Sequence, residues 1–152
     1  MALYLFFIFI GLGAVYGFLI GYRNEPRKEK MTVLKINSHE FNVEIANDPI
    51  SQARGLAGRN SLPENQGMLF LFSDKTTRNF WMAGMRFPLD IIWIDGGTII
   101  GIAENIPPAS NRNFLIYTSP SPADKVLEIN AGLAGKLGIK IGDLVIFSEV
   151  QR

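Results

Sequence analysis

The chain has 152 residues, a formal net charge of +1 and no cysteine. Lysine and arginine are scattered after residue 30, which excludes the dense basic surface that nucleic-acid binding requires. His39 is the only histidine, so a zinc site and a Ser-His-Asp triad are both disfavoured, and we expect neither a metal nor a cofactor. Residues 31–152 are enough for a single domain and too few for two of ordinary size.

The first 22 residues carry no charged side chain, whereas the segment 23–30 is rich in charge. A helix over residues 2–22 would be roughly 30 Å long, which matches the hydrocarbon core of a bilayer. We therefore predict a transmembrane anchor over 1–22, with the lipid bilayer as its partner, and a charged linker over 23–30. A cleaved signal peptide is the alternative. The length of the run and the apolar residues that follow its small-residue pair, Gly11 and Gly13, favour retention.

Gly13, Gly17 and Gly21 recur at every fourth position of this segment and would form one stripe on a helix. Small residues at this spacing are typical of helix dimerisation faces in membranes. The alternative is that glycine is simply common in membrane helices.

The orientation of the anchor is contested by two arguments. Lysine and arginine follow the apolar segment and nothing comparable precedes it, so the positive-inside rule places the domain in the cytoplasm. The family resemblance described below favours the opposite side of the membrane.

Alternating apolar and polar residues predict a hairpin of strands 32–36 and 40–45 around Asn37–Ser38. Asp48–Pro49 then predicts the start of a helix of two to three turns that ends near Gly58. The apolar face predicted for this helix comprises Ile50, Ala53, Leu56 and Ala57.

The rest of the chain is expected to be mostly β. Further strands are predicted at 67–72, 79–82, 89–94, 98–106, 125–130 and 144–150. Asp95–Gly97 provides a hairpin turn, and 131–137 is a short helical or turn segment. The fold class that follows is mostly β (α+β): a small β-sandwich or barrel with one or two short helices.

Three carboxylates are predicted on apolar strand faces. Side chains two positions apart lie on the same face of a strand. Asp90 therefore shares a face with Ile92 and Ile94, and Glu128 shares one with Val126. Glu104 likewise shares a face with isoleucines of its own strand. The isoleucines aligned with Glu104 are Ile100, Ile102 and Ile106. A buried carboxylate needs a hydrogen-bond donor or a cation, and the arginines expected to supply it are Arg54 and Arg59.

This constellation has three interpretations. The first is a structural ion-pair network that pins the helix to the sheet. The second is a polar pocket for a hydroxylated or anionic small molecule, bordered by tryptophan or tyrosine. The third is a hydrolase that uses Asp90 with Glu104 or Glu128 on a small polar or glycan substrate, although no catalytic motif fixes its residues. The candidate binding residues are Arg54, Arg59, Trp81, Asp90, Glu104 and Glu128.

A series of ordered motifs resembles the prokaryotic family known as domain of unknown function 192 (DUF192). These motifs are Arg54–Arg59, Gly67–Phe72, Phe80–Met82, Pro88–Asp95, Pro122–Ala123 with Val126–Glu128, Ala131–Gly132 and Gly138–Asp143. The resemblance covers essentially the whole chain after residue 31. It implies a compact, mostly β domain, often found behind an export signal or membrane anchor, without an established biochemical activity.

One segment departs from the pattern that the resemblance implies. Members of that family commonly carry a basic residue, Asn and Thr after the Phe-Trp-Met motif, whereas this chain has Ala83, Gly84 and Met85. If the polar residues contribute to a site, that site is weaker here or has another specificity.

The sequence therefore predicts a single-pass membrane protein whose β-domain is a binding or interaction module at the membrane surface. The frequent export of the family favours the extracytoplasmic side. The carboxylate-based hydrolase stays open as the alternative.

Overall fold

The computed structural model describes residues 31–109 and 115–147. The strands in these ranges are β1 (Met31–Ile36), β2 (His39–Ala46), β3 (Gln66–Thr76), β4 (Asn79–Trp81), β5 (Leu89–Asp95), β6 (Thr98–Ile106), β7 (Ile116–Thr118), β8 (Ala123–Asn130) and β9 (Val145–Phe147). The helices are α2 (Pro49–Arg54) and α3 (Leu133–Lys136). The prediction of a mostly β domain with one or two short helices is confirmed.

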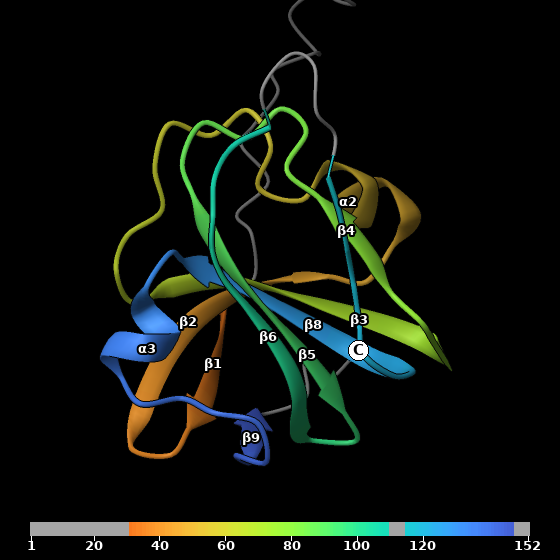
Figure 1. Cartoon of the computed structure of the whole chain (residues 1–152), viewed down its shortest axis with the longest axis vertical. Coiled ribbons are helices and arrows are strands. Elements are labelled where there is room, and N and C mark those ends of the chain that lie inside the picture. The colour runs from red at the N-terminus through yellow and green to blue at the C-terminus, as the bar shows by residue number, and fades with distance from the viewer. Residues whose placement is uncertain (1–30, 110–114, 148–152) are drawn as a thin grey trace, which may run out of the picture.

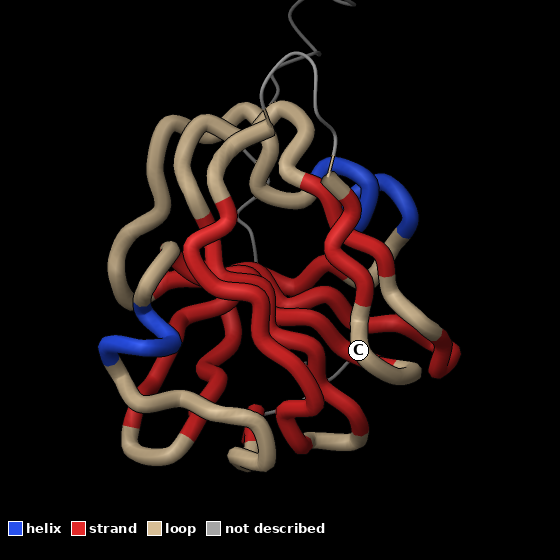
Figure 2. The backbone as a smooth tube through the Cα atoms, viewed as in Figure 1, coloured by secondary structure: helices blue, strands red, loops and turns tan. Residues whose placement is uncertain are grey.

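Seven strands form one sheet in the order β6-β5-β8-β3-β2-β1-β9, and β4 pairs with β7 in a separate ribbon. The large sheet curls into a half-barrel, with α2 and α3 on opposite sides of the molecule (Figures 1 and 2). Backbone hydrogen bonds join its two edge regions: Ile99 donates to Asp143 at 3.0 Å and Val145 donates to Gly97 at 2.8 Å. The sheet therefore closes on itself at one end, as a barrel does, rather than packing on a second sheet as a sandwich would.

The first hairpin is confirmed, with Ile36 paired to His39 across the Asn37–Ser38 turn. The Asp95–Gly97 turn is also confirmed, because both Gly96 and Gly97 have positive φ and Asp95 pairs with Thr98. β7 was not predicted, since its three residues are too few to show alternation. The last strand, predicted over 144–150, covers Val145–Phe147 in the described part of the chain.

The helix at Asp48 begins as predicted and ends earlier. Asp48 caps it by accepting hydrogen bonds from the backbone of Ile50 and Ser51, and Pro49 occupies the first turn. The helix ends at Arg54 because Gly55 adopts φ 51° and turns the chain away. The predicted apolar face is wrong for Ile50, which is 78% exposed, and for Ala53, which is also exposed. Leu56 is buried as predicted, but from the turn that follows the helix.

Two apolar cores occupy the two faces of the curled sheet. The inner face buries residues such as Leu34, Ile92 and Leu127 under α3. The outer face buries a second cluster that includes Phe70, Trp93 and Val126. Strand β5 is buried from Leu89 to Ile94, because it lies between both cores.

Asp90 is fully buried on the inner face, as its alternation with Ile92 and Ile94 predicted. The prediction that Arg54 or Arg59 pairs with Asp90 is wrong. Oδ1 accepts hydrogen bonds from the backbone N–H groups of Asn105 at 2.7 Å and Gly132 at 2.9 Å, and Oδ2 accepts one from Ala134 at 2.9 Å. Asp90 therefore ties β5 to the end of β6 and to the start of α3.

Glu104 is exposed, so its predicted burial is wrong. Strand β6 contains register shifts against β5, between Leu89 and Ile91 and between Trp93 and Ile94. Each shift places an extra residue in β6, which moves the following side chains to the other face. Ile102 consequently packs on the inner core and Ile106 on the outer one, and the alternation that placed Glu104 among them is broken.

The predicted anchor over 1–22, the linker over 23–30 and the glycine stripe lie outside the described residues. In the two described ranges, no helix has the length and apolar character needed to cross a membrane.

We expect Asp90→Ala to lower the melting temperature strongly. The substitution leaves three buried backbone N–H groups without an acceptor, which costs on the order of 3 kcal/mol or more. The control is Asp95→Ala at the end of the same strand, where the partly exposed ion pair with Lys75 should contribute less than about 1 kcal/mol. Calorimetry of both variants tests this, and equal losses would contradict a special role for Asp90.

Candidate functional site

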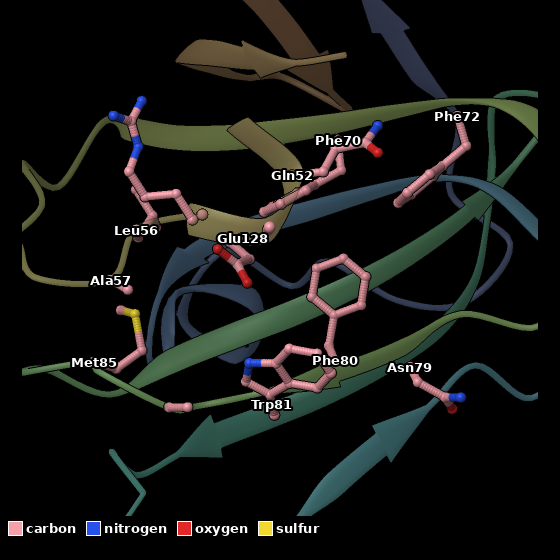
Figure 3. A pocket seen from close by; sticks show the side chains of 14 residues that line it. Gln52, Leu56, Ala57, Phe70, Phe72, Asn79, Phe80, Trp81, Met85 and Glu128 are labelled. Atoms are coloured by element: carbon pink, nitrogen blue, oxygen red, sulfur yellow. The ribbon is translucent and has the colours of Figure 1, made fainter. Parts of the chain in front are cut away.

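A cavity of about 280 Å³ lies on the outer face of the sheet. Its walls come from α2, the turn after it, β3, β4, the segment after β4, and β8. Figure 3 shows the Glu128 carboxylate pointing into the space between these walls, with Phe70 and Phe80 beside it. The cavity therefore combines one acidic group with mostly apolar surroundings.

Glu128 is 5% exposed. It stands on the same face as Val126, as the alternation predicted, and pairs laterally with Met68 of β3 and Ile91 of β5. Its Oε2 has no hydrogen-bond partner among the described residues. Burial disfavours the charged form and raises the pKa of Glu128 from 4.5 to about 8. At neutral pH this carboxyl is mostly protonated.

Gly55 forms part of the wall beside the carboxylate. A Cβ atom at this position would lie 3.4 Å from the Phe70 ring and 3.8 Å from Glu128 Oε2. The positive φ of Gly55 favours glycine and lets the chain reverse directly over the acid. The turn continues to Gly58, whose N–H donates to the carbonyl of Gly84 at 2.9 Å, so that the turn after α2 is fixed to the segment after β4.

Aromatic rings make up much of the remaining wall. Phe70 and Phe80 meet edge to face, with ring centroids 4.9 Å apart. The Arg78 guanidinium lies 3.8 Å from the centroid of Phe72 and covers one face of that ring. Trp81 is 55% exposed, which places it at the mouth of the cavity. These contacts hold the walls in place without a ligand.

A second buried acid, Glu44, lies on the same face one strand beyond β3, since Glu44 pairs with Met68 and Met68 pairs with Glu128. Both of its carboxylate oxygens accept hydrogen bonds from the guanidinium of Arg59. Sequence reasoning missed Glu44, because its strand alternates normally and its partner is 15 residues away. Arg59 is thus part of an ion pair with Glu44, and not with the acids predicted for it.

Three of the six predicted binding residues line the cavity: Arg54, Trp81 and Glu128. Arg59, Asp90 and Glu104 do not. Asp90 and Glu128 occupy opposite faces of the sheet, and Glu104 is at the surface. In the part of the chain that the structure describes, no cluster of three metal-ligating side chains occurs.

The segment that departs from the family pattern forms part of this cavity. Ala83 and Met85 both line it. Figure 3 shows Met85 on the side opposite to Gln52. The wall is therefore apolar at the positions where polar residues are expected from the resemblance.

The model of the DUF192 family, described as "Uncharacterized ACR, COG1430", matches residues 32–147. The chain belongs to the DUF192 family. The match spans the whole sheet of the DUF192 domain, from β1 to β9. A comparison with curated proteins gives no match.

Two solved structures are similar to the DUF192 domain. One is a "putative transcription regulator" from Sinorhizobium meliloti 1021, with 34% identity, a TM-score of 0.73 and coverage of 78% of this chain and 95% of that one. The other is a protein of unknown function from Novosphingobium aromaticivorans, with 33% identity, a TM-score of 0.74 and coverage of 81% and 89%.

The burial of Glu128 should make the stability of the domain depend on pH. Between pH 4.5 and about 8, Glu128 is protonated in the folded chain and ionised in the unfolded chain. The folded state then binds more protons, so the free energy of unfolding falls as pH rises, by at most about 1.4 kcal/mol per unit. This contribution is complete below pH 4.5 and is lost by about pH 8.

Urea unfolding of the wild type and of Glu128→Gln at several pH values measures this effect. The variant keeps a neutral polar group, so its stability relative to the wild type should increase across this range and then level off. Glu40→Gln, which changes an exposed acid on β2, is the control and should run parallel to the wild type. Parallel profiles for Glu128→Gln would show that the carboxyl is not buried in its acid form.

Proposed function

We propose that this DUF192 domain is a binding module, tethered to a membrane by residues 2–22, that holds a small molecule over Glu128. One observation carries the proposal: a carboxyl that is 5% exposed, with an unpartnered oxygen, lines an open cavity. A buried polar group without a partner costs free energy, and a ligand that pairs with it recovers that cost.

The other buried acids of the domain give the contrast that supports this proposal. Asp90 accepts three backbone hydrogen bonds, and Glu44 is paired with Arg59. Each of these two is accounted for by its contacts within the chain. Glu128 is not, and it is the one that lines the cavity.

A two-carboxylate hydrolase is less well supported. A hydrolase of that kind needs two carboxyl groups in the same site, roughly 5 to 10 Å apart on either side of the bond that is cleaved. Among the described residues, Glu128 is the one acid that lines the cavity, since Asp90 is on the inner face and Glu104 is at the surface. Binding therefore accounts for the geometry better than this type of catalysis.

The description of one structural neighbour as a transcription regulator does not add a second candidate. Direct contact with DNA depends on a basic surface, and the net charge of this chain is +1 with no dense basic patch after residue 30.

The membrane part of the proposal is supported by the sequence. Residues 2–22 are uncharged and long enough to span a bilayer as a helix, and the stripe of Gly13, Gly17 and Gly21 suits pairing of two anchors. We propose the extracytoplasmic side for the domain because members of the family are often exported, although the charges after residue 22 favour the cytoplasm.

Binding can be tested by NMR of the full-length chain in a non-ionic detergent. The probes are choline, n-butylamine, glucose, acetate and N-methylacetamide, and the reporters are the Met85 methyl and the Trp81 indole, which both line the cavity. We expect at least one probe to shift both signals at millimolar concentration.

Ala83→Phe fills the cavity and should abolish these shifts, whereas Val33→Phe on the exposed side of β1 should retain them. A panel without any shift at the two reporters, or shifts that persist in Ala83→Phe, would contradict the proposed function.

The anchor and its orientation can be tested with one engineered thiol. The chain has no cysteine, so Ser38→Cys in the exposed β1–β2 turn provides a single labelling site. We expect a membrane-impermeant maleimide to label this site in intact spheroplasts, and N-terminal sequencing to find residues 1–22 retained. Labelling only after lysis would place the domain in the cytoplasm, and a start after Gly13 would show cleavage.

A further inference from the structure

The Gln52 amide in the cavity wall has its donor group already in use. Gln52 lines the wall with its amide, and its Nε2 already donates to the carbonyls of Leu71 at 2.7 Å and Ala46 at 3.3 Å. Glu128, once ionised, only accepts hydrogen bonds. A ligand that brings its own donor or positive charge is therefore complementary to this pair.

The aromatic walls have the same preference. Phe70, Phe80 and Trp81 line the cavity beside the carboxyl (Figure 3), and the faces of such rings attract cations. Tryptophan attracts cations more strongly than phenylalanine, and Trp81 lies at the mouth. The thioether of Met85 and the methyl of Ala83 add apolar surface that suits the carbon atoms around a cationic nitrogen.

The other charged side chains around the cavity already interact within the chain, so a bound cation would pair with Glu128. The acid of Glu44 is already paired with Arg59, and the guanidinium of Arg78 is occupied by Phe72 and Asp74. Arg54 is the cationic side chain of the lining; it lies on the exposed last turn of α2 and makes interactions of its own. Once Glu128 is ionised, its carboxylate repels an anionic ligand and attracts a cationic one.

We propose that the cavity binds an alkylammonium group, whose positive charge pairs with the Glu128 carboxylate while its carbon atoms pack against Phe70, Phe80 and Trp81. This inference rests on the proposed binding function and names the chemical class of its ligand. A volume of about 280 Å³ lies at the lower end of ligand pockets and suits a small amine or quaternary ammonium compound.

Binding of the cation requires Glu128 to release its proton, and this gives the proposal a distinctive signature. Below about pH 8 the empty site holds the proton, so each ligand bound must displace one. The affinity for a permanently charged ligand should then rise by up to about tenfold per pH unit and level off above pH 8.

The test compares choline with 3,3-dimethylbutan-1-ol, its neutral counterpart of the same shape, by titration calorimetry of the full-length chain in non-ionic detergent. We expect choline to bind at least about tenfold more tightly at pH 8, as one net ion pair is worth in a partly buried site. At neutral pH the heat should depend on the ionisation enthalpy of the buffer, with a sign that corresponds to proton release.

Two variants separate charge from shape. Glu128→Gln should remove both the preference for choline and the proton release, while Glu40→Gln on the exposed side of β2 should keep both. Trp81→Ala changes a side chain that is 55% exposed, and it should weaken choline binding about fivefold with a smaller effect on the alcohol.

Equal affinities for the two probes at every pH, or choline binding that is independent of pH and retained in Glu128→Gln, would overturn the proposal. Binding of glucose or N-methylacetamide, with no binding of choline or n-butylamine, would also overturn it but would leave the proposed binding function standing. A cavity that takes none of the probes contradicts both.

Discussion

Three backbone N–H groups converge on the carboxylate of Asp90, and the curled shape of the sheet depends on that contact. The groups come from Asn105 at the irregular end of β6 and from Gly132 and Ala134 at the start of α3. Because one side chain of β5 joins both, the inner core beneath α3 stays closed. Pairing with β5 and β3 holds β8 in the middle of the sheet, and its alternate side chains face outward.

Glu128 is the outward-facing acid on β8, and its comparison with Asp90 shows that buried carboxyl groups serve two purposes on opposite faces of the sheet. Asp90 has its hydrogen bonds supplied by the backbone, so its burial stabilises the fold. Glu128 has no such donors on Oε2, and burial instead holds its proton to higher pH. The proposed ligand would supply the missing partner, which links affinity, pH and stability through a single carboxyl group.

The sequence predicted most of the local structure because local patterns determine it. Alternation identified the first hairpin, and the Asp95–Gly97 turn and the Asp48 cap followed from turn and capping chemistry. The helical apolar face was wrong because the helix stops at Gly55, so that Leu56 is buried from the following turn while Ile50 stays exposed. The site was predicted only in part: the burial of Glu128 followed from alternation, whereas the pairing of Arg59 with Glu44 joins distant segments that leave no local pattern.

The sequence by itself determined that this is a mostly β domain of the DUF192 family, with acids placed among apolar residues on its strands. Those properties depend on spacing along one strand, where side chains alternate between two faces. Only the tertiary structure decided which acid is satisfied and which is not. That outcome depends on bulges in β6, on the reversal at Gly55 and on the order of strands in the sheet, and each of these sets distances between residues far apart in the chain.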